Sequence, residues 1–500
     1  MADASRPLVL RLRLALLLSF SLLLLRLHLA SKVGFADAEA LYASYALHPQ
    51  PAYLDHPGLV GAVMRLLGGG GVPTPLVAHT ASAFAATLLP WLGALGARAA
   101  GASGSGAFRT LFALALVPEL AVGLFSLTPD LLLGLLWLGA LGAAALALRC
   151  EAGSSRALYA FLACGGLLGL AVLAKVSAVL LLLALLATLC TRGARPHLRT
   201  FAPWAALLLT AILVMPLVLW EAARGYPMLE HRLVSTQADA GLSLRNAAVL
   251  LGGQLLYLSP PALFAAALIA RSLYVKRRED ITSTLLWNAT WIPGLVLAAL
   301  CLWSRVAEPH WLAPAYLALA LDLGRSSLLP RRLAAVSLAT GAVLCVLAWF
   351  WVGTDLPPQL LGQRYPEHDP SNDLYAWGPG KKLVLEVVED TMREKQAPPV
   401  VVGPHYIVCA QAHAALGPNI PVGCNTPRRD DFDDWLPRQR WLDAPVVLYV
   451  RDERFGLDAA PELPNRIVRS VATVSVRRGD LVVRRLQVIR LDKLSDTAAR

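Results

Sequence analysis

Residues 130–149 read DLLLGLLWLGALGAAALALR, and their only ionisable side chains are Asp130 and Arg149 at the two ends. A bilayer core about 30 Å thick is crossed by a helix of about 20 predominantly apolar residues. This stretch therefore predicts a membrane-spanning helix. Similar Leu- and Ala-rich stretches recur before residue 353. The pattern predicts an α-helical polytopic membrane protein.

The composition agrees with a membrane protein. Of the 500 residues 56% are hydrophobic and 16% are charged, whereas about 25% of a soluble domain is charged. The 45 Lys and Arg against 34 Asp and Glu give a formal charge of +11. The high apolar content excludes disorder and argues against a soluble nucleic-acid-binding protein, so no nucleic-acid partner is expected.

Charge divides the chain near Gly353. Residues 1–353 hold 25 basic and 14 acidic residues, whereas residues 354–500 hold 20 of each. The whole positive excess therefore lies in the apolar part. We expect a transmembrane domain over 1–353 and a soluble domain over 354–500.

The apolar part contains eleven candidate spans. They cover approximately residues 10–30, 76–98, 109–127, 130–149, 157–174, 176–191, 202–221, 247–270, 283–303, 312–324 and 333–352. With the N-terminus in the cytoplasm, 17 Lys and Arg fall on the inside and 8 on the outside, as short cytoplasmic loops require. An odd number of spans places the tail outside the cytoplasm. The alternative for the first span is a signal peptide, although no small-x-small cleavage site follows it.

The predicted outer face gathers acidic, basic and histidine side chains. Ionisable residues at or near membrane depth indicate function more often than other residues do. The loop at 34–67 supplies the first five of these residues, and later junctions between spans supply the others. The candidate site residues are Asp37, Glu39, Asp55, His56, Arg65, Asp130, Lys175, Arg305, Glu308 and His310.

The same residues carry a family resemblance. Asp37-Ala-Glu-Ala-Leu-Tyr, followed by Tyr53-Leu-Asp-His-Pro, resembles the first outer loop of GT-C membrane glycosyltransferases. The resemblance is to the group that contains lipid A aminoarabinose transferases and protein O-mannosyltransferases, including bacterial family 39-like members. Weaker matches are Thr128-Pro-Asp, Leu173-Ala-Lys and Glu308-Pro-His-Trp, and the resemblance extends over about residues 30–430. The sequence departs from the family pattern at Ala38, which separates Asp37 from Glu39, whereas the two acidic residues of the family are adjacent.

The resemblance implies a sugar donor on a polyprenyl phosphate and a lipid, glycan or protein acceptor. It also implies a multi-pass enzyme among the lipids of the cytoplasmic membrane, with its C-terminal domain outside the cytoplasm. The acceptor hydroxyl needs a carboxylate as general base, for which Asp37 is the first candidate and Glu39 the second. One displacement inverts the anomeric centre. The alternative is a covalent sugar intermediate with Asp55 as the nucleophile.

The leaving phosphate needs nearby positive charge. Lys175, Arg65, Arg305 and His310 are the candidates for it. Two of them have structural alternatives: Lys175 could extend from a helix end towards the interface, and Arg65 could anchor an amphipathic segment over 58–68 to lipid headgroups. Among the remaining candidates, Asp55 could orient His56 or cap a helix that Pro57 begins, Asp130 could stabilise a helix start, and Glu308 could pair with its basic neighbours.

The sequence predicts no cofactor. No Cys and His cluster has zinc spacing, and His48, His56 and His310 could share a metal only if folding brings them together. The four glycines at 68–71 lack the setting of a nucleotide loop, so direct use of a nucleotide sugar is not expected. A competing interpretation of the chain is a transporter or lipid-linked-sugar flippase, but the charges crowd one face and no internal repeat is seen.

The tail is predicted to be a small α/β domain. A helix is expected over 382–391, and strands over 400–402, 444–450, 467–468, 474–476, 481–483 and 488–491. Cys409 and Cys424 are the tail's two cysteines. Outside the cytoplasm they could form a disulfide, although free cysteines are the alternative.

Overall fold

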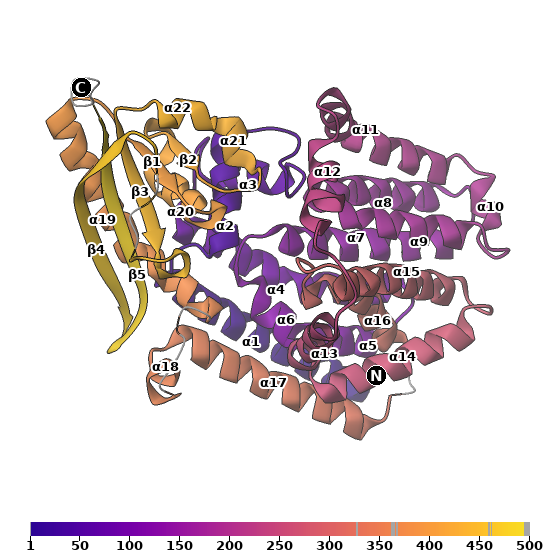
Figure 1. Ribbon diagram of the computed structural model, residues 1–500. Helices are drawn as coiled ribbons and strands as arrows, with labels where there is room; N and C mark the ends of the chain where they lie inside the picture. Colours follow the sequence, from indigo (N-terminus) through magenta and orange to yellow (C-terminus); the bar gives the residue numbers. More distant parts are fainter. Residues whose placement is uncertain are drawn as a thin grey trace. The chain divides into compact units, whose positions relative to one another are not determined.

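The computed structural model describes residues 2–326, 329–361, 366, 369–458, 461 and 463–494. The chain divides into two compact units, which are described separately (Figure 1). Unit 1 comprises Met1–Leu27, Pro51–Leu59 and Ala81–Trp349, and unit 2 comprises His28–Gln50, Val60–Thr80 and Phe350–Arg500. The predicted first outer loop is therefore divided between the units.

Unit 1 is built from apolar helices. Seven helices are long and apolar enough to cross a membrane, within the described residues. They are α1 (Ala2–Ala30), α4 (Pro75–Ala99), α7 (Pro129–Arg149), α8 (Ser155–Ala174), α11 (Ala202–Ala223), α15 (Ile281–Trp303) and α17 (Arg331–Gly353). Each coincides with one of the predicted spans, and the multi-pass membrane fold is confirmed.

The other four predicted spans are bent or short. α5 (Gly104–Ala115) and the turn over Pro118–Phe125, which includes α6 (Pro118–Ala121), meet at 72°, and α13 (Leu244–Leu258) and α14 (Pro260–Lys276) meet at 96°. A proline begins the second half of each pair, where it cannot donate the helical hydrogen bond. α9 (Val179–Leu189) and α16 (Ala313–Arg325) are 11 and 13 residues long, less than a bilayer core requires. The described residues thus give seven to nine candidate spans, and the predicted number of eleven is not confirmed.

Glycines let the helices of unit 1 approach closely. α8 packs against both α7 and α11, and a Cβ atom on Gly165 of α8 would collide with the backbone of Ala206 of α11. Gly142 of α7 approaches Gly96 of α4 in the same way, and Gly106 of α5 approaches the backbone of Gly324 in α16. Small residues at crossings are the usual means of packing helices in lipid.

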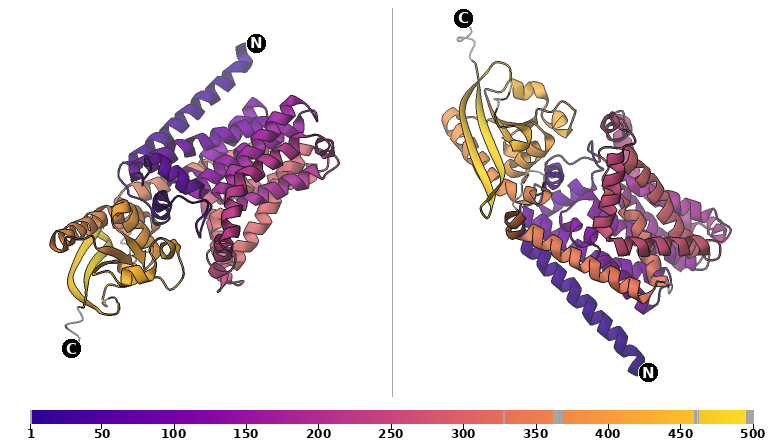
Figure 2. Two further views of the ribbon diagram at one scale, coloured as in Figure 1. Left: turned by 90° about the horizontal axis from the view of Figure 1, so that it is seen from above. Right: turned by 60° about the horizontal axis from the view of Figure 1, so that its bottom comes forward.

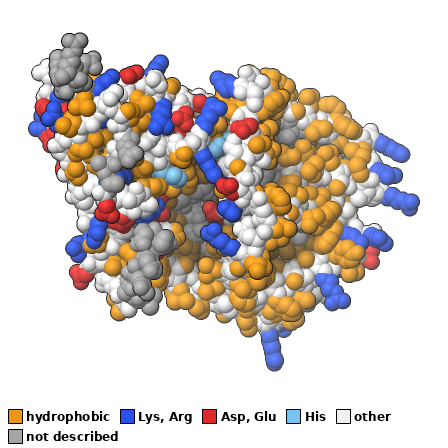
Figure 3. Space-filling model, in the orientation of Figure 1, with side chains coloured by type: hydrophobic (Ala, Val, Ile, Leu, Met, Phe, Trp, Pro, Cys, Tyr) orange, Lys and Arg blue, Asp and Glu red, His pale blue; other side chains and the backbone are white. Residues whose placement is uncertain are grey.

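The surface of unit 1 suits a bilayer. Hydrophobic side chains cover much of its visible face, and Lys and Arg gather at the end where α10 (Arg195–Leu198) lies (Figure 3). The turn around α10 contains Arg192, Arg195 and Arg199, which the sequence assigns to the cytoplasmic side. The N-terminal part of α1 projects beyond its neighbours (Figure 2), and only 6% of its most apolar window is buried.

Unit 2 contains a five-stranded sheet in the order β2-β1-β3-β5-β4. Its strands are β1 (Val400–Gly403), β2 (Val422–Cys424), β3 (Val446–Asp452), β4 (Arg466–Arg478) and β5 (Leu481–Lys493). The first three are parallel, and β5 pairs antiparallel with both β3 and β4. Helix α19 (Asp373–Lys395) contacts β4 and β5, and α20 (Tyr406–Leu416) contacts β1, β2 and β3. The predicted α/β character is confirmed, and the four short strands predicted over 467–491 form the two long strands β4 and β5.

Helices from the predicted first outer loop also belong to unit 2. α2 (Asp37–Ser44) packs against α20, and α3 (Leu59–Leu67) follows it in the chain. The remaining α-helices are α12 (Pro227–Leu233) in unit 1, and α18 (Leu356–Leu361), α21 (Asp431–Trp435) and α22 (Arg438–Leu442) in unit 2. The contact between α2 and α20 places the acidic residues of α2 against the C-terminal part of the chain.

Cys409 of α20 and Cys424 of β2 form a disulfide that closes a loop of 15 positions. Replacing both by Ser is expected to lower the free energy of unfolding of unit 2 by about 3 kcal/mol, because the open chain gains entropy when unfolded. Protease sensitivity of unit 2 in the full-length protein, measured against urea, reports this change. The Cys150→Ser variant, which loses a free thiol in unit 1, is the control. Equal urea midpoints for all three proteins would contradict the prediction.

Candidate active site

Asp130 and Lys175 form an ion pair where two packed helices have their ends. The Thr128 side chain caps α7 by accepting from the backbone N–H of Leu131, so that Asp130 lies in the first helical turn, where a carboxylate is favoured. α8 ends at Ala174, and Lys175 takes an extended conformation after it. Because α7 and α8 are neighbours, Lys175 Nζ lies 2.7 Å from Asp130 Oδ1.

His310 extends this ion pair. It lies on the short helix η5 (Pro309–Leu312) between α15 and α16, with Nε2 3.8 Å from Asp130 Oδ2 and Nδ1 3.1 Å from Glu308 Oε2. Burial alone would lower the pKa of His310, but the two carboxylates outweigh it and raise the pKa to about 9. His310 is therefore a cation at neutral pH, and charges alternate along the row Lys175, Asp130, His310 and Glu308.

The raised pKa of His310 makes the stability of unit 1 depend on pH. An unfolded His has a pKa of about 6.5, and the folded value is about 9. The stabilisation is therefore complete below pH 6.5 and is lost as pH rises through 9. We expect the midpoint of thermal unfolding to fall over this interval in the wild type and to fall less in His310→Gln. Parallel profiles for the two proteins would contradict this assignment.

Contacts with Asp55 and Trp311 hold a second cation, Arg232, at the site. Arg232 Nη1 lies 3.1 Å from Asp55 Oδ1, and His231 Nε2 lies 3.7 Å from the same oxygen. The Trp311 ring is 5.2 Å from Lys175 Nζ and 5.7 Å from the Arg232 guanidinium, within the range of cation–π attraction. Lys175 and Arg232 are thus held close to one indole ring, each with a carboxylate partner.

His56 lies beside these charges in a tight turn. The turn is closed by hydrogen bonds from the Tyr53 N–H to the His56 carbonyl and from the Gly58 N–H to the Pro51 carbonyl. Burial, followed by the positive charges of Lys175 and Arg232, lowers the pKa of His56 well below its ordinary value. His56 is therefore neutral at physiological pH.

Asp37 lies in a separate ionic cluster, within unit 2. Its Oδ2 is 2.7 Å from Arg454 Nη1, and its Oδ1 accepts a 3.2 Å hydrogen bond from the Gln411 side chain. Arg454 also pairs with Asp452 at 2.7 Å. Burial, and next the charge of Asp37, raise the pKa of neighbouring Asp373 to about 6. The Asp37 side chain remains 11% exposed.

Glu39 and Arg65 have partners of their own in unit 2. Glu39 Oε2 lies 2.7 Å from His79 Nε2, and both side chains are fully buried. Arg65 Nη1 donates to the Ala46 carbonyl at 2.8 Å. These contacts tie together segments of the predicted first outer loop and of α4.

The sequence-predicted residues therefore fall into three groups. The first group, in unit 1, contains Asp55, His56, Asp130, Lys175, Glu308 and His310, and the second is Arg305, which lines a pocket of that unit. The third group is Asp37, Glu39 and Arg65 in unit 2. Within the described residues, no three His, Cys, Asp or Glu side chains are arranged to hold a metal ion.

Sequence reasoning missed Arg232, His231 and Trp311 as site residues. Arg232 lies on the predicted outer side of the membrane, but nothing in its sequence neighbourhood marks it as a partner of Asp55. Trp311 follows His310 directly, and an aromatic beside a basic residue at a span junction was an available signal. Glu119, which interacts electrostatically with His310 and Asp130, was signalled by being ionisable within an apolar stretch.

The chain has the fold of solved GT-C proteins. Two structures of ArnT from Cupriavidus metallidurans, one bound to undecaprenyl phosphate and one in the apo state, have TM-scores of 0.61 and 0.62. Their sequence identities to this chain are 17% and 16%, and each comparison covers 97% of this chain and 98% of the other. No curated protein matches the chain in sequence.

One segment also matches a family at the level of sequence. Residues 74–220 match the family model described as dolichyl-phosphate-mannose-protein mannosyltransferase. With the shared fold, this match confirms the resemblance to GT-C membrane glycosyltransferases that was predicted from the sequence. The prediction of an enzyme of this class is likewise confirmed.

Proposed function

We propose that this protein transfers a sugar from a polyprenyl phosphate to a lipid, glycan or protein acceptor at the outer face of the cytoplasmic membrane. The observation that carries the proposal is the pair of cations, Lys175 and Arg232, held against Trp311 in unit 1. A sugar phosphate on a lipid leaves as a phosphate anion, and fixed cations stabilise the charge that develops on it. The solved ArnT structure of the same fold contains undecaprenyl phosphate.

The arrangement suits a substrate that enters with its own negative charge. Asp55 and Asp130 hold the two cations in place before the donor arrives. A donor phosphate would then bind N–H groups of Lys175 and Arg232 alongside these carboxylates, which keep the two cations oriented. The protonated His310 lies on the other side of Asp130 and supplies further positive charge.

We assign the general base to Asp37, with Glu39 as the alternative. The Asp37 carboxylate is oriented by Arg454 and Gln411 and keeps an exposed fraction of 11%. Glu39 has no exposed side-chain surface and is bound to His79, so an acceptor hydroxyl would reach it only after rearrangement. Asp55 is paired with Arg232, so we assign it to holding that cation and propose one inverting displacement, with a covalent intermediate on Asp55 as the alternative.

We further propose that unit 2 lies outside the cytoplasm. The Cys409–Cys424 disulfide supports this orientation, since disulfides persist in oxidising compartments. Labelling of unit 2 in intact cells by a membrane-impermeant reagent tests the orientation, and protection of unit 2 until the membrane is opened would contradict it.

The donor class is tested with the purified protein in proteoliposomes. Radiolabelled sugar is supplied either on polyprenyl phosphate or on a nucleotide, together with an extract of envelope lipids and glycans as acceptor. We expect label to move to acceptor from the polyprenyl carrier only. Transfer from the nucleotide carrier, or movement of intact donor across the bilayer without transfer, would contradict the proposal.

A further inference from the structure

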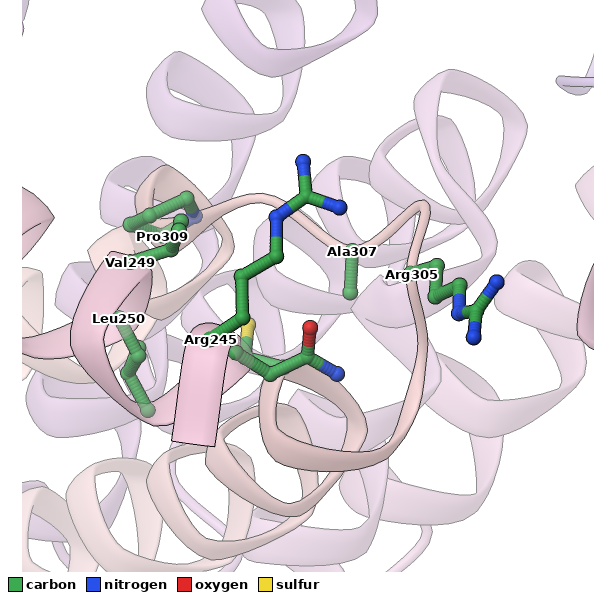
Figure 4. Close-up of a pocket in the computed structure, with 8 residues that line it drawn as sticks. Arg245, Val249, Leu250, Arg305, Ala307 and Pro309 are labelled. Atoms are coloured by element: carbon green, nitrogen blue, oxygen red, sulfur yellow. The ribbon is translucent and has the colours of Figure 1, made fainter. Parts of the chain in front are cut away.

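A pocket of unit 1, next to the loop that carries Glu308 and His310, combines two arginines with apolar walls. It is lined by residues from the first two turns of α13 and from the end of α15 with the loop that follows it (Figure 4): Arg245, Asn246, Val249, Leu250, Cys301, Arg305, Ala307 and Pro309. Arg245 rises from the start of α13 beside the loop, and Arg305 lies on the loop beyond Ala307 (Figure 4). The pocket thus offers cations at its rim and aliphatic side chains along its wall.

The two arginines lack protein partners. Throughout the part of the chain that the structure describes, neither guanidinium group has a hydrogen bond, an ion pair or an aromatic ring contact. Both side chains are exposed. Arg232, by contrast, is paired with Asp55 at 3.1 Å. Two unpaired guanidinium groups at one pocket favour an anion, and Arg suits a phosphate because its planar fork donates two parallel hydrogen bonds.

The backbone segments that present the arginines are fixed to one another. The Asn246 side chain donates to the Leu302 carbonyl at 3.1 Å, and the Gly241 N–H donates to the Trp303 carbonyl at 2.8 Å. A Cβ atom on Gly253 of α13 would collide with Pro309. The start of α13 therefore stays beside the end of α15, and the pocket is a built feature of the fold.

The pocket lies where a span ends. Arg305 follows Trp303, the last residue of α15, by two positions, and Trp is typical of the boundary between acyl chains and headgroups. Apolar residues within three positions of the two arginines in sequence are exposed, with Leu242 at 75%, Leu244 at 91% and Trp303 at 50%. Cations at the end of a span match the level of lipid phosphates, and the apolar wall of the pocket matches the start of an acyl chain.

We propose that this pocket binds the phosphodiester headgroup of an anionic phospholipid, with Arg245 and Arg305 contacting the phosphate and Val249 and Leu250 contacting the acyl chain. Arg305, predicted from the sequence to bind substrate, then binds a lipid of the bilayer beside the catalytic site. The pocket includes Pro309, which precedes His310, so a bound headgroup borders the loop that carries the catalytic cluster. This proposal does not depend on the identity of the donor or acceptor.

The test is photolabelling in phosphatidylcholine nanodiscs with phosphatidylglycerol that carries a diazirine next to its glycerol backbone. Mass spectrometry locates the label, which we expect on peptides spanning 244–250 and 301–309. Arg245→Gln and Arg305→Gln are each expected to reduce this labelling about tenfold, since each removes a charge-assisted contact. Arg278→Gln is the matched control, because Arg278 is also exposed but lies before the start of α15, at the opposite end of the span.

The outcomes separate a specific site from general attraction to charge. The site is supported if labelling of the pocket peptides decreases in the two pocket variants and not in Arg278→Gln. Labelling elsewhere on each variant must equal that of the wild type. Unchanged labelling in the double variant R245Q/R305Q would overturn it. More effective displacement of the label by polyprenyl phosphate than by unlabelled phosphatidylglycerol would also overturn it, because the occupant would then be the donor lipid.

Discussion

Replacement of Asp37 by Asn is expected to lower the rate of sugar transfer by about 10²- to 10⁴-fold, the range lost when a general base is removed. The amide keeps the shape of the carboxylate and can still accept from Gln411, but it cannot take the proton of an acceptor hydroxyl. The loss should appear in kcat, with the KM for the donor little changed, because a general base acts on the acceptor hydroxyl in the transition state and not on the donor phosphate. Initial rates over a range of donor concentrations measure both constants.

Two variants control this experiment. Asp434→Asn removes a carboxylate from an exposed ion pair with Arg429 in the same unit and should leave the rate unchanged. Glu39→Gln disrupts the buried pair with His79 and should reduce thermal stability more than the rate of the folded protein. A full rate in Asp37→Asn together with loss in Glu39→Gln would transfer the role of base to Glu39.

Replacement of Lys175 or Arg232 by Gln is expected to lower the rate by about 10²- to 10³-fold, the range for removing one group that stabilises transition-state charge. Both cations contact the Trp311 ring, so each variant leaves the other cation in place. The double variant K175Q/R232Q should lose more than either single variant. Single-turnover measurements with radiolabelled donor separate the effect on the chemical step from that on donor binding.

Two control variants test whether a loss of rate comes from the missing cation itself or from a side effect of its removal. Lys175→Gln leaves Asp130 without its 2.7 Å partner, so the variant K175Q/D130N, which removes both charges, tests whether unpaired Asp130 accounts for the loss. Arg224→Gln is the matched control for Arg232: Arg224 lies between α11 and α12, and its guanidinium contacts the Trp220 ring at 4.6 Å. Wild-type rates in both Lys175→Gln and Arg232→Gln would remove the basis for the donor site.

Most of the helical architecture follows from composition and hydropathy. A stretch of about 20 apolar residues has few alternatives to a membrane helix, and the seven longest spans were predicted with only small errors in their ends. The bent helix pairs were harder to predict, because the apolar composition of a stretch does not show where the helix axis changes direction. Pro118 and Pro260 were visible signals of the breaks, but a proline within a membrane helix is often tolerated, as Pro216 is in α11.

The candidate site was predicted only in part because it depends on contacts distant in sequence. Asp130, Lys175 and His310 each lie at the end of an apolar segment, and ionisable residues there can be recognised without a structure. Arg232 is 177 positions from Asp55, and sequence spacing does not predict such a contact. Glu39 could not be assigned a buried partner for the same reason, since His79 lies 40 positions away within another helix.

The most direct test of the proposed function is release of radiolabelled sugar from polyprenyl phosphate by the purified protein in proteoliposomes. Wild type should convert donor to free polyprenyl phosphate and an equal amount of sugar on the acceptor, with the anomeric configuration inverted. Asp37→Asn and Lys175→Gln should slow this conversion by at least about 10²-fold, while Asp434→Asn should not. Donor left intact by folded wild-type protein across a range of envelope acceptors would contradict the account.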